Sequence, residues 1–160
     1  MKIIKIILVI LWMSLIFFFS NQKANDSTKL SDGLILKTVR IIEKINHKTY
    51  SDEEILKKFV KPVRKLAHFT IYFILGILVY LLMKEYNIKN IIIISLLICI
   101  IYSITDEIHQ LFVIGRTGKV LDVIIDSVGS YTGIILIKFL NKKNNKNNYE
   151  KSLNSLEYPN

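Results

Sequence analysis

Four long apolar runs restrict what this chain of 160 residues can fold into. They cover residues 3–19, 66–83, 91–105 and 121–140. An α-helix rises about 1.5 Å per residue, so each run comes near the roughly 30 Å hydrocarbon core of a bilayer, the first and third only marginally. We therefore predict an all-α integral membrane bundle of about four transmembrane helices, with an interfacial helical loop between the first two spans.

A soluble bundle that buries these runs in its core is the competing interpretation. Such a bundle needs a polar face for water on its helices. The stretch over residues 88–102 has only Lys89, Asn90 and Ser95 as polar interruptions, so no polar face remains there. Hydrophobic residues make up 51% of the chain, and they are concentrated in the runs rather than spread at amphipathic spacing. Both features favour the membrane.

The remaining segments divide the chain around these spans. Residues 1–20 are predicted to form the first transmembrane helix, an uncleaved signal anchor, because Phe17 to Phe19 precede Ser20 where a cleavage site needs small residues. Residues 21–65 are predicted to be a polar loop with amphipathic helices, and residues 66–140 a three-helix transmembrane core. Residues 141–160 are rich in Asn and Lys, which predicts a disordered tail.

Two helices are expected inside the polar loop. Asp32 is a candidate N-cap for a helix that lies in the membrane interface. The apolar positions of that helix are Leu34, Ile35, Val39, Ile42 and Ile45. Residues 51–54, Ser-Asp-Glu-Glu, have the pattern of a capping box that opens a second short helix. Pro62 is then a natural first residue for the membrane helix that follows.

The formal net charge of +9 would suggest a nucleic-acid partner in a soluble protein. Here Lys and Arg flank the spans, where they anchor to headgroups and anionic lipid, so we predict no nucleic-acid partner. The overall count of Lys and Arg favours termini outside the cell, because residues 20–65 form the most basic loop. The flanks of the first, third and fourth spans favour the opposite orientation. We predict a multi-pass protein of the cell membrane with both termini in the cytoplasm.

Polar residues gather at one membrane face of the predicted bundle. In a four-span chain, the start of the second span, the end of the third and the start of the fourth all lie on the same face. The unusual polar residues at these positions are Arg64, His68, Asp106, Glu107, His109, Gln110, Arg116, Asp122 and Asp126. Ionisable groups near hydrocarbon are costly, and they usually pair, line a wet cavity or bind a ligand. We interpret the nine residues as a binding site for a polar headgroup.

Helical spacing indicates where the acidic residues of the fourth span point. Asp122, Asp126, Gly129 and Gly133 share one face of an ideal helix. Glycines allow a neighbouring helix to approach closely, so the two carboxylates should face the bundle interior. The structural alternative is that Arg64 pairs with Asp126 or Asp122 only to hold the helices together.

Catalysis by the same residues is a second possibility. Glu107 or Asp126 would act as general base and His109 or His68 as proton shuttle, which makes Glu107, His109 and Asp126 the catalytic candidates. Arg64 or Arg116 would bind phosphate. Carboxylates at Asp106, Asp122 and Asp126 would suit a hard cation, but no ligand spacing requires one, so we predict neither a metal nor a cofactor.

The motifs that carry these residues resemble the VanZ-like family over about residues 5–140. They read Phe-Ser-Asn-Gln at 19–22, Arg-Lys-Leu-Ala-His-Phe at 64–69, Asp-Glu-Ile-His-Gln-Leu-Phe at 106–112, Gly-Arg at 115–116 and Asp-Val-Ile-Ile-Asp at 122–126, followed by Gly129 and Gly133. The resemblance implies a multi-pass membrane protein, and the family's named member is associated with low-level resistance to the glycopeptide teicoplanin.

Our leading functional prediction is a protein that modulates the envelope response to teicoplanin-type glycopeptides through the polar site. Besides the bilayer, its candidate partners are a cell-wall precursor, a lipid headgroup or the glycopeptide itself. A membrane-embedded hydrolase or transferase that acts on a lipid-linked substrate is the first alternative. An accessory membrane subunit, whose polar residues only fix helix packing, is the second.

Overall fold

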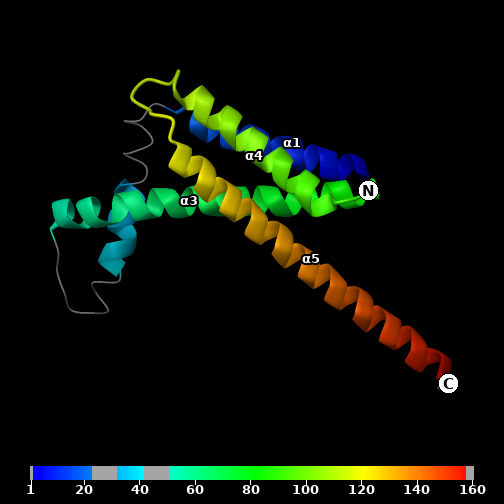
Figure 1. Ribbon diagram of the computed structural model, residues 1–160. Coiled ribbons are helices and arrows are strands. Elements are labelled where there is room, and N and C mark those ends of the chain that lie inside the picture. The colour runs from blue at the N-terminus through cyan, green and yellow to red at the C-terminus, as the bar shows by residue number, and fades with distance from the viewer. Residues whose placement is uncertain (1, 23–31, 42–50, 158–160) are drawn as a thin grey trace.

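The computed structural model describes residues 2–22, 32–41 and 51–157, with side chains described up to residue 143. Its long helices are α1 (Lys2–Ser20), α3 (Asp52–Lys84), α4 (Ile91–Gln110) and α5 (Val120–Glu157), shown in Figure 1. The four are long and apolar enough to cross a membrane, α5 over Val120–Lys143. The predicted all-α bundle with four spans is therefore confirmed.

A short helix over residues 32–41 lies between the first two spans, as the amphipathic pattern predicted. Ile35 is buried, whereas Leu34 and Ile41 are exposed. Two further apolar positions of the predicted helix, Ile42 and Ile45, lie outside the described residues.

Helix α3 begins at the predicted capping box. The backbone N–H of Glu54 donates to Ser51 Oγ, and the Ser51 N–H donates to the Glu54 carboxylate. The expectation of two separate helices, with the second starting at Pro62, was wrong because Pro62 lies inside one continuous helix. The capping box and the acidic first turn start the helix ten residues before Pro62. Proline removes one main-chain hydrogen bond, and the residues around Pro62, over 61–67, are exposed.

Helix α5 continues to Glu157, whereas we expected a disordered tail from residue 141 onward. No glycine or proline stands between Gly133 and Pro159, so nothing in the sequence breaks the helix there. In Figure 1 the C-terminal part of α5 extends beyond the ends of the other helices.

Three glycines bring the main chains of α3 and α5 together. A Cβ added at Gly129 or Gly133 would collide with the carbonyl oxygen of Phe69 or Phe73 on α3. A Cβ added at Gly76 would collide with the carbonyl oxygen of Ser130 on α5. The close approach predicted from Gly129 and Gly133 is thus confirmed, and it fixes how far Asp126 reaches across toward α3.

Helix α1 is held against α3 and α4 by side chains that reach main-chain oxygens. Trp12 Nε1 donates to the Ile71 carbonyl at 3.0 Å, and the Tyr102 hydroxyl donates to the Met13 carbonyl at 2.6 Å. Lys5 forms an ion pair with Glu85, just after α3 ends. The buried apolar residues between the helices include Val9, Ile16, Tyr72, Leu75, Val79 and Cys99.

The end of α1 and the loop after α4 lie together, which makes the membrane orientation testable. We expect single cysteines at Asn21 and Thr117, on a Cys99→Ala background, to react with a membrane-impermeant maleimide in intact cells. A cysteine at Asn87, in the turn after α3, should react only after permeabilisation. The reverse pattern would place the termini outside, and opposite reactivity at positions 21 and 117 would contradict the four-span arrangement.

Candidate functional site

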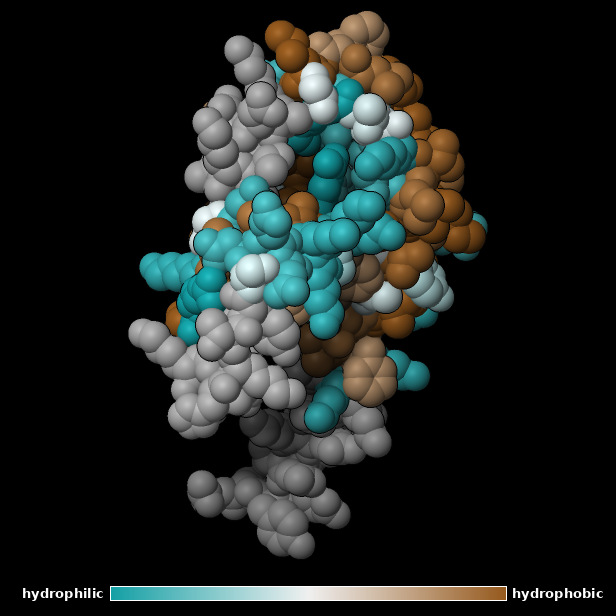
Figure 2. Space-filling view, turned by 90° about the vertical axis from the view of Figure 1, so that its left-hand side faces the viewer, coloured by the Kyte–Doolittle hydropathy of each residue, from teal (hydrophilic) through white to brown (hydrophobic). Residues whose placement is uncertain are grey.

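A cavity of about 310 Å³ lies where α1 and α4 end, between α1 and α3. Figure 2 looks onto this end of the molecule and shows hydrophilic side chains gathered around a hollow, with apolar surface beside them. The apolar part of the lining comes from Ile16, Phe19, Val60, Val63, Ala67 and Ile71. Its polar part comes from Ser20, Gln22, Arg64, His68, Tyr72, Asp106, Gln110 and Arg116. The cavity is therefore amphipathic.

Four buried polar atoms in this lining make no hydrogen bond of good geometry with a described residue, although Ser20 lies near Asp106 and Ser103 near Tyr72. The four atoms are Ser20 Oγ, the Tyr72 hydroxyl, Asp106 Oδ1 and Gln110 Oε1. The four residues are at most 4% exposed. Buried polar groups are nearly always paired, so water or a ligand in the cavity is the expected partner of these atoms.

Arg116 connects the loop after α4 to the end of α1. Its guanidinium donates to the carbonyl oxygens of Phe19 at 2.9 Å and Gln22 at 2.8 Å. The Phe19 carbonyl, in the last turn of α1, also accepts from the Gln22 backbone N–H at 3.4 Å. Gly115, with φ of 77°, supplies the left-handed turn that presents Arg116. The motif at 19–22 and the Gly115–Arg116 pair are thus parts of one contact.

Arg64 lies close enough to Arg116 for the two charges to interact. Burial, and then the positive charge of Arg64, lowers the pKa of the Arg116 guanidinium from its usual value. Arginine stays charged near neutral pH in spite of such a shift. Both side chains line the cavity, so two cationic groups face its contents.

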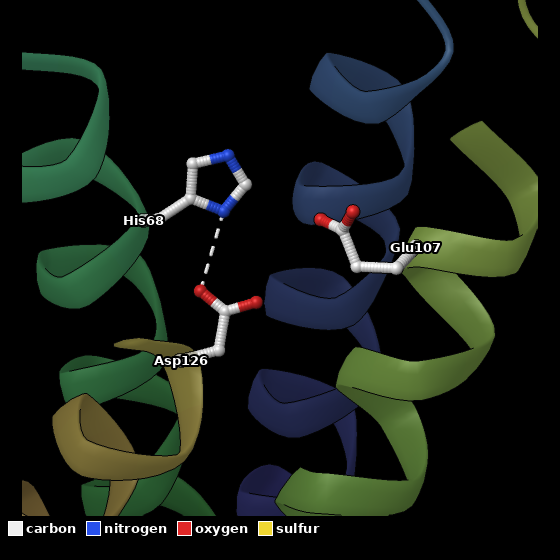
Figure 3. A group of neighbouring side chains, drawn as sticks. All are labelled: His68, Glu107 and Asp126. Atoms are coloured by element: carbon white, nitrogen blue, oxygen red, sulfur yellow. Dashed lines mark hydrogen bonds and ion pairs between the residues drawn. The ribbon is translucent and has the colours of Figure 1, made fainter. Parts of the chain in front are cut away.

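Asp126 is fully buried where α3, α4 and α5 meet. Its Oδ1 lies 3.2 Å from His68 Nδ1 on α3 (Figure 3). Its Oδ2 accepts from Ser103 Oγ on α4 at 2.7 Å. The structural alternative, in which Arg64 pairs with Asp126 or Asp122, was wrong for the described residues, since neither pair forms. His68 lies one turn further into the bundle than Arg64, and therefore reaches Asp126 instead.

Glu107 faces the same region from α4. Its Oε2 accepts from the Lys119 backbone N–H at 2.7 Å, and its Oε1 accepts from Gln110 Nε2 at 3.2 Å. Gln110 Nε2 also lies 3.3 Å from Asp106 Oδ2. His68, Glu107 and Asp126 each offer one ligand atom, and these atoms lie within 4.8 Å of one another (Figure 3).

Comparison with protein-family models gives a match to VanZ/LLP1 over residues 5–141. The chain belongs to the VanZ/LLP1 family. The matched segment contains every residue that lines the cavity, so the cavity is part of the family domain. No curated protein and no solved structure matches this VanZ/LLP1 chain.

The structure brings most of the predicted site residues of this VanZ/LLP1 protein together. Arg64, His68, Asp106, Gln110 and Arg116 line the cavity. Glu107 and Asp126 do not line the cavity, but their carboxylates lie next to His68, which does. Asp122 is buried one turn before Asp126.

His109 lies apart from this group. Its ring packs against Phe17 of α1, with 4.5 Å between ring centroids, and it does not line the cavity. Successive side chains on an α-helix point about 100° apart, so His109 points away from Gln110 and toward α1.

Sequence reasoning missed Ser20 and Ser103 as members of the site in this VanZ/LLP1 chain. Ser103 was detectable, because small polar side chains recur every four residues along α4, at Ser95, Cys99 and Ser103. All three are buried, and the same stripe leads to Glu107. No comparable pattern marks Ser20, which is placed in the cavity by the end of α1 and the Arg116 contact.

Proposed function

We propose that the cavity binds the phosphate-bearing headgroup of a membrane lipid or lipid-linked envelope precursor. The observation that carries the proposal is the joint lining of one cavity by two arginines and by four buried polar atoms that make no hydrogen bond of good geometry with a described residue. Arginine recognises phosphate through paired, charge-assisted hydrogen bonds. The unpartnered hydroxyls and oxygens would take up the remaining polar groups of the ligand.

Cavity size and position support a headgroup rather than a whole lipid. The volume of about 310 Å³ is at the small end of ligand pockets, which span about 300–1,000 Å³. Ile16, Ile71 and Val63 form an apolar wall on which the first carbons of a lipid chain would rest. The rest of the chain would stay in the bilayer, beside the exposed apolar side chains of α1.

We propose further that occupancy of this site modulates the envelope response to glycopeptides of the teicoplanin type. Family membership and the membrane setting support this role. Teicoplanin carries an acyl chain that partitions into membranes, and glycopeptides act on peptidoglycan precursors outside the membrane. A protein that binds a precursor or lipid headgroup at that face would alter access of the drug.

Deletion and overexpression of the gene test this role. We expect teicoplanin susceptibility to change by more than vancomycin susceptibility, and complementation by Arg64→Gln to fail. Lys84→Gln, which removes an exposed charge at the other end of α3, is the matched control and should complement. Unchanged susceptibility to both drugs, with expression confirmed by immunoblot, would count against a role in glycopeptide response.

One observation favours hydrolysis or group transfer as a second candidate function. Asp126 lies at hydrogen-bond distance from His68, an arrangement in which a carboxylate orients an imidazole as general base. Release of phosphate from a lipid-linked substrate by purified protein, lost in His68→Gln, would support it.

A further inference from the structure

We propose that His68, Glu107 and Asp126 form a binding site for one divalent first-row transition-metal cation, such as Mn²⁺ or Zn²⁺. The three residues come from three different helices, α3, α4 and α5, and their ligand atoms lie within 4.8 Å of one another. Figure 3 shows the Glu107 and Asp126 carboxylates and the His68 imidazole turned toward one region between the helices. No single motif of the sequence contains the set.

The charge balance of the region requires a cation or bound protons. Asp106, Glu107, Asp122 and Asp126 are each at most 5% exposed. Among the described residues, the His68–Asp126 contact is the only ion pair that any of these four carboxylates makes. Several buried carboxylates that share one imidazole are costly in a low-dielectric region. A divalent cation reduces this imbalance by binding two of the carboxylates directly.

The carboxylates of Glu107 and Asp126 are oriented by hydrogen-bond donors that are not among the three proposed ligands. Ser103 Oγ donates to Asp126 Oδ2, and the Lys119 backbone N–H donates to Glu107 Oε2. Gln110 Nε2 donates to the second oxygen of Glu107. Partners of this kind fix the direction of metal-binding carboxylates in known sites.

A second observation points to a ligand next to the same residues. Asp106 Oδ1 and Gln110 Oε1 are buried oxygens that make no hydrogen bond of good geometry with a described residue, in the wall of the cavity that His68 also lines. They are acceptors, which suit water molecules bound to a cation. The oxygens therefore indicate that the region holds something with hydrogen-bond donors or positive charge.

Ligand chemistry selects the class of metal. Carboxylate oxygens alone would suit Mg²⁺ or Ca²⁺, whereas one imidazole nitrogen with two carboxylates suits Mn²⁺, Fe²⁺ or Zn²⁺. Bonds of about 2.1 Å in a tetrahedral site separate ligand atoms by about 3.4 Å. Cation binding would therefore draw the most distant pair of ligand atoms together by up to about 1.4 Å. It would also replace the direct contact between His68 Nδ1 and Asp126 Oδ1.

A cation at this position would add positive charge beside the cavity. Together with Arg64 and Arg116 it would favour phosphate over a neutral headgroup, a consequence that rests on the proposed function. Binding of the cation itself requires only the three ligands. The two ideas therefore fail separately in the experiment that follows.

The test uses the full-length protein, purified without a histidine tag in detergent, stripped with EDTA and then incubated with Mn²⁺ or Zn²⁺. We expect one cation per chain by elemental analysis after desalting, and a raised melting temperature in the presence of the cation. His68→Gln, Glu107→Gln and Asp126→Asn should each weaken binding by at least about tenfold. His109→Gln, which changes a histidine outside the group, should bind as the unchanged protein does.

Ser103→Ala is a second test variant in case a ligand variant fails to fold. It keeps all three ligands and removes a donor that orients Asp126. It should weaken Mn²⁺ affinity while the protein stays monodisperse. Absence of stoichiometric binding to the folded protein, or equal binding by all variants, would overturn the metal site.

Lipid binding in detergent separates this inference from the proposed function. We expect the Mn²⁺-loaded protein to bind short-chain phosphatidylglycerol more tightly than a diacylglycerol with the same chains, which lacks the phosphate. Cation binding without such lipid preference would contradict the headgroup proposal alone, and lipid preference without cation binding would contradict the metal site alone.

Discussion

Gly133→Ala should separate α3 from α5 and lower the stability of the whole bundle. The new Cβ would collide with the Phe73 carbonyl oxygen, a main-chain atom that cannot move without shifting the helix. Overpacking of a well-packed contact costs about 1–3 kcal/mol, and a collision with main chain belongs at the upper end. We expect a large fall in the melting temperature of the purified protein and in its folded yield. Gly129→Ala should behave similarly, because its Cβ would collide with the Phe69 carbonyl.

Gly33→Ala is the matched control for this prediction. A Cβ at Gly33 meets no atom within 4 Å, and alanine is a better helix former than glycine. The Gly33 variant should therefore melt at or slightly above the temperature of the unchanged protein. Equal melting temperatures for Gly133→Ala and Gly33→Ala would mean that the close approach of α3 and α5 does not exist.

Arg116→Ala should release the end of α1 that borders the cavity. The guanidinium makes two hydrogen bonds to carbonyl oxygens there, and bonds to a charged group contribute about 1.5–3 kcal/mol each. A thiol introduced by Ser20→Cys reports the change, because Ser20 is only 4% exposed. On a Cys99→Ala background we expect slow maleimide labelling at position 20, and labelling at least about tenfold faster when Arg116 is also replaced.

The control for Arg116 acts on the opposite end of the same helix. Lys5→Gln removes the ion pair with Glu85 and should leave labelling at position 20 slow. Fast labelling at position 20 with Arg116 intact, or no acceleration in Arg116→Ala, would show that this arginine does not position α1.

The sequence predicted the four spans because the length and hydropathy of a transmembrane helix can be recognised in its sequence. The start of α3 was predicted less well. The capping box at Ser51 was recognised, but the continuation of one helix through Pro62 was not. Local rules for proline favour a boundary, whereas the capping box and the acidic first turn start the helix ten residues before Pro62. The composition of the segment after Asn141 likewise predicted disorder, although it lacks any helix breaker.

The candidate site was predictable as a set of residues but not as a set of contacts. Helical spacing placed Asp126 toward the interior, and the structure has it fully buried. Which base reaches Asp126 depends on the axial offset of α3 against α5, and the contacts at Gly76, Gly129 and Gly133 set that offset. Spacing alone did not decide this pairing, and the site prediction kept His109 although its side chain points about 100° away from that of Gln110.

The hydrogen bonds that hold α1 restrict substitution at the donor positions more than at the acceptor positions. Trp12, Tyr102 and Arg116 donate their side-chain hydrogens to main-chain oxygens of Ile71, Met13 and Phe19. Every amino acid supplies such an oxygen, so the accepting positions can change to other apolar residues and keep the bond. The three donors have no such freedom. A deep mutational scan would therefore show few tolerated substitutions at the three donors and many at the acceptors. Apart from Trp12, α1 could diverge widely in sequence and keep its place in the bundle.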